Sequence, residues 1–176
     1  MKKRFIITLL VSALVFTGCG TKNEEEKTQY FDFTKNEIVN ELEEWLIDYT
    51  LITIIDYEET EKIATYTCGS DVITITNGVD DGLLHYKFVY NDETNKVSSI
   101  SFFLEEDIEQ SRARYLYHIS SISQSIDPNV NIDEIYDTVK DGLNGEGFAI
   151  YNSENFILHA SKSDDYFNAH FKPNIN

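Results

Sequence analysis

The chain has few of the residues that form disulfide frameworks or bind polyanions. Its 176 residues include two cysteines, and 14 Lys and Arg stand against 31 Asp and Glu, for a net charge of −17. Such a charge argues against nucleic acid and an anionic bilayer surface as partners, because both repel an acidic protein. It permits a cationic partner, such as a basic protein, a cationic peptide or a metal ion. The simpler interpretation is that the charge serves solubility alone.

Cysteine is too scarce to cross-link the fold. If Cys19 is modified as described below, Cys68 is left as a single thiol. The chain has no CxxC pair, and nothing near Cys68 in the sequence would lower the pKa of its thiol. The role that we expect for Cys68 is therefore that of a small buried apolar residue.

Pro and Arg are also scarce, and the composition is typical of an AT-rich genome, so we expect a Gram-positive source.

Familiar catalytic motifs are missing as well. The four histidines lack the HxxxH or HExxH spacing of a helical zinc site, and there is no GxSxG nucleophile elbow. Two of them, His159 and His170, fall on neighbouring predicted strands, which allows them to approach each other, although a structural or surface role is the simpler interpretation. The sequence therefore predicts no catalytic residue, no metal centre and no cofactor.

Two loops resemble ligand sites only superficially. The glycine-rich segment 141–147 follows a predicted helix and precedes a predicted strand, which is the reverse of a phosphate loop, so Gly142 and Gly145 are interpreted as helix stops. Residues 127–133 place Asp or Asn at alternate positions, as a calcium loop does. An EF-hand needs Gly at its sixth position and a carboxylate at its twelfth, and these are Ile132 and Thr138 here.

The N-terminus has the build of a secretory signal peptide. Met1-Lys2-Lys3-Arg4 is basic, and residues 5–16 form an apolar run too short for a membrane span of about 20 residues. The run ends in Phe16-Thr17-Gly18-Cys19, which resembles the lipobox of bacterial lipoproteins, although that family prefers Leu where Phe16 stands. The resemblance implies that Cys19 carries a diacylglycerol and that signal peptidase II cuts in front of it. An ordinary cleaved signal and a retained N-terminal anchor are the competing interpretations.

The expected domain organisation follows from this resemblance. Residues 1–18 are the signal peptide, residues 19–29 are the lipidated cysteine and a polar, flexible tether, and residues 30–176 are a single α+β domain. Lipid chains would hold the domain on the outer face of the cytoplasmic membrane. The membrane, reached through the lipid anchor, is thus one expected partner.

The pattern along the domain predicts an N-terminal helix, an antiparallel meander of about five strands, two consecutive helices and about three C-terminal strands. Thr34 and Glu37 form a capping box at the start of the first helix, whose helical period reaches Tyr49 and includes Trp45 on its apolar stripe. Runs of β-branched and aromatic residues predict the first five strands at 51–56, 63–68, 72–76, 85–90 and 97–104.

The second half continues the same pattern. One helix is predicted over 106–125, and a second begins after Asn131, which forms a capping box with Glu134. The last strands are predicted at 148–151, 156–160 and 166–171. Runs of strands and runs of helices, rather than strict alternation, indicate an α+β fold with the helices packed on one face of the sheet.

Four residues are candidates for a binding surface. Arg112 and Arg114 are the only arginines after the signal peptide, and they form either local ion pairs or a small anion-binding spot. Tyr86 and Tyr90 lie on a predicted strand and would either contribute to an aromatic surface or pack in the core. The preferred function is a non-catalytic domain that binds a protein or peptide, with a basic or envelope protein as partner. The alternatives are a domain that binds a small ligand or cation and, less favoured, an envelope hydrolase.

Overall fold

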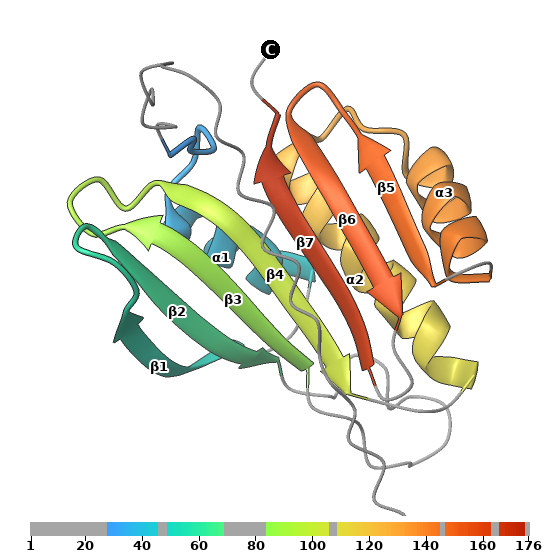
Figure 1. Ribbon diagram of the computed structural model, residues 1–176, viewed down its shortest axis with the longest axis horizontal. Helices are drawn as coiled ribbons and strands as arrows, with labels where there is room; N and C mark the ends of the chain where they lie inside the picture. The colour runs from blue at the N-terminus through green and yellow to red at the C-terminus, as the bar shows by residue number, and fades with distance from the viewer. Residues whose placement is uncertain are drawn as a thin grey trace, which may run out of the picture.

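A computed structural model describes residues 28–45, 49–68, 84–105, 109–144, 147–162 and 166–174 of the protein. Within these segments the strands form one seven-stranded antiparallel sheet of order β1-β2-β3-β4-β7-β6-β5, accompanied by three helices (Figure 1). The elements in chain order are α1 (Lys35–Trp45), β1 (Tyr49–Asp56), β2 (Glu61–Cys68), β3 (Leu84–Asn91), β4 (Val97–Glu105), α2 (Glu109–Ile126), α3 (Ile132–Asn144), β5 (Phe148–Asn152), β6 (Phe156–Lys162) and β7 (Tyr166–Pro173). The predicted α+β class is confirmed.

The sheet consists of two meanders that meet at β4 and β7. Strands β1 to β4 follow one another in space as in sequence, and so do β7, β6 and β5. The two meanders join through Ile100 opposite Phe171, Phe102 opposite Ala169 and Leu104 opposite Phe167. All of these side chains are buried. The connection between the meanders is the pair α2 and α3, which crosses the back of the sheet (Figure 1).

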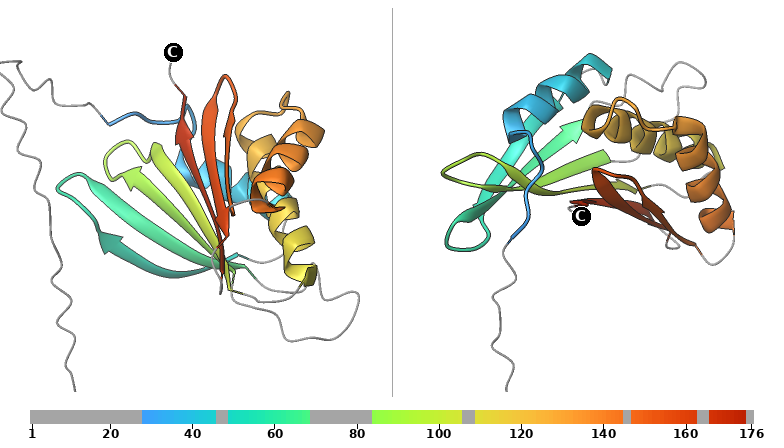
Figure 2. Two further views of the ribbon diagram at one scale, coloured as in Figure 1. Left: turned by 45° about the vertical axis from the view of Figure 1, so that its right-hand side comes forward. Right: turned by 90° about the horizontal axis from the view of Figure 1, so that it is seen from above.

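The three described helices cover one face of the sheet, and none of them lies on the other face, as the view from above shows (Figure 2). This division follows from the alternation of side chains along a strand. In β3 the inward positions are fully or almost fully buried, and the residues between them are partly or fully exposed. Each large apolar side chain in this core contributes about 1.5–3 kcal/mol through burial. The largest buried members are Tyr86, Tyr115, Phe88, Phe102, Phe156 and Phe171.

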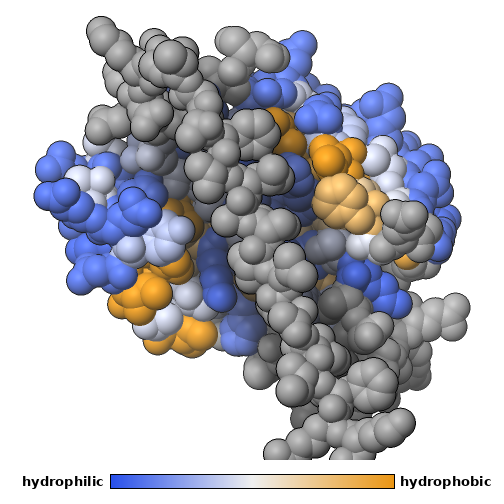
Figure 3. Space-filling view, viewed as in Figure 1, coloured by the Kyte–Doolittle hydropathy of each residue, from blue (hydrophilic) through white to orange (hydrophobic). Residues whose placement is uncertain are grey.

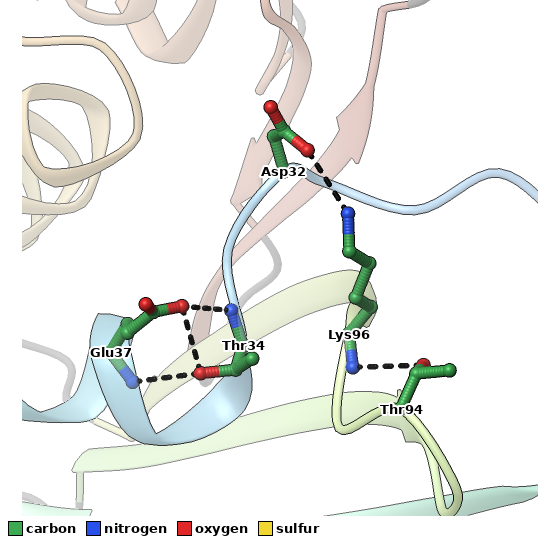
Figure 4. Close-up of polar contacts among 5 residues, drawn as sticks. All are labelled: Asp32, Thr34, Glu37, Thr94 and Lys96. Atoms are coloured by element: carbon green, nitrogen blue, oxygen red, sulfur yellow. Dashed lines mark hydrogen bonds and ion pairs between the residues drawn. The ribbon is translucent and has the colours of Figure 1, made fainter.

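The capping box predicted for α1 is present. The Thr34 backbone N–H donates to Glu37 Oε2 at 2.7 Å, and the Glu37 backbone N–H donates to Thr34 Oγ1 at 3.3 Å (Figure 4). Hydrogen bonds from Thr34 lower the pKa of the Glu37 carboxyl. Just before the cap, the Asp32 carboxylate pairs with Lys96 Nζ at 3.0 Å, which ties the entry of the domain to the β3–β4 turn (Figure 4).

The start of α3 is also capped as predicted, but its end differs. Asn131 Oδ1 accepts hydrogen bonds from the backbone N–H groups of Asp133 and Glu134, at 3.1 and 3.4 Å. Gly142, expected to stop the helix, instead lies inside α3. A Cβ atom there would collide with Ala149 of β5, so this glycine allows the helix to pack closely against the sheet.

Two other boundaries differ from the prediction. Tyr49 begins β1 instead of continuing the first helix, because its backbone pairs with Cys68 of β2. The strand predicted at 72–76 lies outside the described residues, so the first meander has four described strands. No helix in the described part of the chain combines the length and the apolar character that a membrane span requires.

A buried polar contact joins α2 to the sheet. The Tyr86 hydroxyl of β3 lies 2.5 Å from His118 Nδ1, and both residues are almost inaccessible to solvent. A polar group in such an interior needs a hydrogen-bond partner, because it has given up its contacts with water. The pair therefore fixes the position of α2 against β3 as well as filling volume.

We expect Tyr86→Phe to lower the free energy of unfolding by about 1–2 kcal/mol, because His118 loses this hydrogen bond while ring packing is kept. Urea denaturation followed by circular dichroism measures the change. Tyr136→Phe, on the exposed side of α3, is the matched control and should stay within about 0.5 kcal/mol of the original protein. An equal loss in both proteins would contradict the role of the pair.

Candidate functional site

The first candidate site is the outer edge of β1. The strand stands at the end of the sheet, so one of its two sides has no neighbouring strand among the described elements. Its sequence, YTLITIID, is apolar at positions that face both sides of the sheet. Four large side chains are about half exposed: Leu51 45%, Ile52 51%, Ile54 47% and Ile55 50%. Together these four residues form what we call the β1 edge.

The location of this edge explains the exposure. Ile54 lies opposite Ala64 and therefore faces the helix side, whereas Ile55 lies opposite Ile63 and faces the open side. Neither position is buried, because the helices pack over the centre of the sheet and not over β1 (Figure 2). Hydrophobic colour gathers on the open face over the β1 side and again over the β5 side (Figure 3). On β5 the exposed large apolar residues are Phe148 and Ile150.

The turn that follows β1 is acidic. Asp56, Glu58 and Glu59 are exposed there. A basic residue near them is Lys62, whose Nζ lies 2.9 Å from Asp92 and 4.0 Å from Asp56. The hydrogen bond to Asp92 raises the pKa of Lys62, so its positive charge is retained and largely matched. The β1 edge thus ends beside a net negative charge.

The second candidate site is a row of polar side chains on the open face. His159 of β6 lies directly opposite His170 of β7, and His170 lies opposite Ser101 of β4. The Ser101 Oγ is 2.7 Å from His170 Nδ1. Lys87 continues the row on β3, where its Nζ lies 4.7 Å from the centre of the Phe103 ring. The sequence placed His159 and His170 on neighbouring strands, and the structure pairs them directly.

His170 is held in its neutral form. Burial lowers the pKa of its imidazole to about 4, and the charges of Lys172 and His159 act in the same direction. A neutral imidazole next to a hydroxyl can accept a proton or bind a metal ion through its free nitrogen. No group of three or more His, Cys, Asp and Glu side chains gathers as a metal site in the described segments.

A third feature is an open hollow of about 490 Å³ at the end of the sheet where the chain enters the domain. The stacked rings of Phe31 and Phe33, 4.9 Å apart, form part of its wall. The polar lining comes from Tyr30, Asp32, Asn155 and Asn174, with Ile126 and Pro173 completing it.

The structure describes the side chains of two of the four sequence-predicted surface residues. Tyr86 and Tyr90 are 0% and 4% exposed, so these two were wrong as a binding surface: both point into the helix-covered core. Arg112 and Arg114 lie on α2, and their side chains, like that of Trp45, fall outside what the structure describes. Cys19 also precedes the first described residue.

The residues of segment 127–133, which resembles a calcium loop only superficially, have structural roles. Asp127 is nearly buried, and its Oδ1 accepts the backbone N–H of Asn129 at 3.0 Å. Asn131 caps α3. The β1 edge was missed from the sequence, because a continuous apolar run is typical of a strand covered on both faces.

No protein-family model, no curated protein and no solved structure matches this chain significantly. The candidate sites therefore rest on geometry and chemistry alone.

The depressed pKa of His170 predicts a pH dependence of stability. An unfolded histidine titrates near pH 6.5. Between about pH 6.5 and 4, this residue is therefore protonated in the unfolded chain but not in the folded chain. The stability contributed by neutral His170 is complete above pH 6.5 and is lost as the pH falls through 4. Between pH 7 and 4.5, His170→Gln should lose about 1 kcal/mol less stability than the original protein, since partial exposure reduces the full linkage effect. Urea titrations at both values measure this, and equal losses would contradict it.

Proposed function

We propose that this chain is a lipid-anchored extracytoplasmic protein whose domain binds an extended segment of another protein or peptide along the β1 edge. The observation that carries the proposal is the set of four half-exposed large apolar residues on a strand that has no neighbour on one side among the described strands. An added strand would satisfy the backbone N–H and C=O groups of that side and cover the apolar side chains.

The composition of β1 supports this proposal over the alternative that β1 is an edge strand without a binding role. Proteins commonly protect edge strands with lysine, proline or a bulge that turns the strand away. Strand β1 contains neither lysine nor proline, and its one irregularity lies between Leu51 and Thr53. The stretch from Thr53 to Asp56 pairs with β2 in an unbroken register, which leaves a regular stretch of edge for a partner strand.

The charge near the edge favours a basic partner. Asp56, Glu58 and Glu59 are exposed at its end, and the chain as a whole carries −17. Opposite charge speeds encounter and fixes the register of an added strand. A segment with alternating apolar and basic residues on an envelope protein or secreted peptide fits both features, and nucleic acid does not.

Cross-linking in intact cells tests the edge. A photoreactive residue replaces Thr53 in the full chain, and a discrete cross-linked species is expected. Ile54→Lys should abolish that species, because a charged lysine on the edge opposes strand addition. Ile150→Lys is the matched control, since Ile150 is equally exposed (44%, against 47% for Ile54) but lies at the opposite edge of the sheet.

If Ile54→Lys and Ile150→Lys reduce the cross-linked species equally, the result contradicts the β1 edge as the docking position. Absence of a cross-linked species at low and at physiological salt would favour the second candidate function, a domain that binds a small ligand. The hollow between Phe31, Phe33 and Asn174 is the observation that supports this alternative. A rise in melting temperature with a solute would identify such a ligand.

The lipid anchor has its own test. Cys19→Ser should abolish incorporation of labelled palmitate and leave the precursor unprocessed, because the acyl chains that supply membrane affinity attach to that sulfur. Labelling and cell fractionation measure both effects. If the original protein and Cys19→Ser are both cleaved and released from the membrane, the segment is an ordinary signal peptide. If the protein stays in the membrane without any lipid label, the segment is a retained anchor.

A further inference from the structure

His159 and His170 form a juxtaposed pair whose role the proposed edge binding does not explain. They are direct partners in the antiparallel pairing of β6 with β7. Residues opposed in this way on one face have Cβ atoms about 4.5–5.5 Å apart. Leu158 and Ala160 on one strand, and Ala169 and Phe171 on the other, are buried under the helices, so both imidazoles face the open side. Both are partly accessible there.

We propose that His159 and His170 together bind one divalent transition-metal ion of the zinc or copper class, with solvent filling the remaining coordination positions. Imidazole nitrogen is a preferred ligand for these ions, and two such nitrogens on rigid neighbouring strands need little rearrangement to share one ion. The site is independent of the β1 edge, from which it is separated by the strands β2, β3 and β4.

Ser101 supports the pair as a positioning residue. A histidine that binds a metal through one ring nitrogen usually donates a hydrogen bond from the other, which fixes both the tautomer and the ring orientation. The Ser101 Oγ lies 2.7 Å from His170 Nδ1 and can accept that hydrogen bond. In this arrangement the lone pair of His170 Nε2 is free for a metal ion.

Asn168 supplies a second observation. It lies two residues before His170 on the same face of β7, and its Oδ1 is buried without a hydrogen-bond partner in the structure as described. A buried carbonyl oxygen without a partner is costly, and such atoms often mark the place of a bound water or ion. A water molecule on the metal ion would donate a hydrogen bond to this oxygen.

The fixed charges around the histidine pair affect which ions it can bind. Lys172, two residues after His170 on the same face, is the nearest fixed charge along β7, and Lys87 lies beyond Ser101 on β3. Both oppose a cation and would favour an anion. The two possibilities therefore predict opposite effects for removal of Lys172: metal affinity should rise by a few-fold, whereas anion affinity should fall.

Calorimetric titration of the full chain with Zn²⁺ tests the proposal. The protein is purified in a non-ionic detergent through a histidine-free affinity tag and titrated at pH 7.5. His159→Gln and His170→Gln should each weaken zinc binding by about tenfold or more, and Ser101→Ala by about tenfold, because an outer hydrogen bond of this kind commonly contributes 10–100-fold to affinity. His85→Gln, another open-face histidine on β3, is the matched control and should bind like the original protein.

Nitrogen-15 NMR of the four imidazole rings provides a readout that does not depend on affinity. Zinc should shift the Nε2 signal of His170 and a ring nitrogen of His159, and should leave His85 and His118 unchanged. The proposal is overturned if zinc does not bind at millimolar concentration, if either Gln variant binds as well as the original protein, or if the shifted signals belong to other rings. The proposal is also overturned, in favour of an anion site, if Lys172→Gln binds zinc more weakly than the original protein and the original protein binds inorganic phosphate more tightly than Lys172→Gln.

Discussion

The pairing of β4 with β7 is the contact on which the rest of the structure depends. It joins strands far apart in the sequence and turns two separate meanders into one sheet. Phe102 beside Ala169 and Leu104 beside Phe167 place apolar side chains on one face along the joint. Tyr115 of α2 packs over this joint, with its ring centre 5.2 Å from that of Phe102 and 4.8 Å from that of Phe167. Its hydroxyl donates to the Asn168 carbonyl at 2.5 Å, and burial raises the pKa of that phenol strongly.

Because the helices cover the joint from one side only, the sheet acquires two different faces. The covered face contains the aromatic core, and the open face collects polar and basic side chains around β4, β7 and β6. The edges of the sheet extend past the helices, which explains why the apolar residues of β1 and β5 remain half exposed. A sheet that was covered on both faces would offer neither an apolar edge nor an accessible histidine pair.

The environments of two histidines illustrate this division. His118 lies under the sheet, where its hydrogen bond to Tyr86 joins helix to strand. His170 lies on the open face, where its Nδ1 makes a similar contact with Ser101 Oγ and the residue is partly accessible. Both are imidazoles beside a hydroxyl, yet only the second is near another histidine and accessible to a solute. Position in the sheet, not residue type, separates a structural role from a proposed binding role.

The sequence alone determined the local features of this protein. Capping boxes act within three residues and strand periodicity within a few, so α1, α3 and the last three strands could be located from neighbouring residues only. The sequence could also place His159 and His170 on neighbouring strands, because only a few residues separate consecutive C-terminal strands. The same local reasoning placed Gly142 at a helix end, because the neighbouring residues give no information about Ala149, which packs against Gly142 from another element.

Tertiary structure alone decided which face is covered and which strand lies at the edge. Alternation shows that Tyr86 and Tyr90 share a face, but it does not say that the helices pack there, and so it could not assign them to the core. The apolar run of β1 predicts burial on both sides, whereas its position at the end of the sheet leaves it half exposed. Strand order depends on contacts such as that of β4 with β7, which join residues far apart in the chain and leave no trace in local sequence.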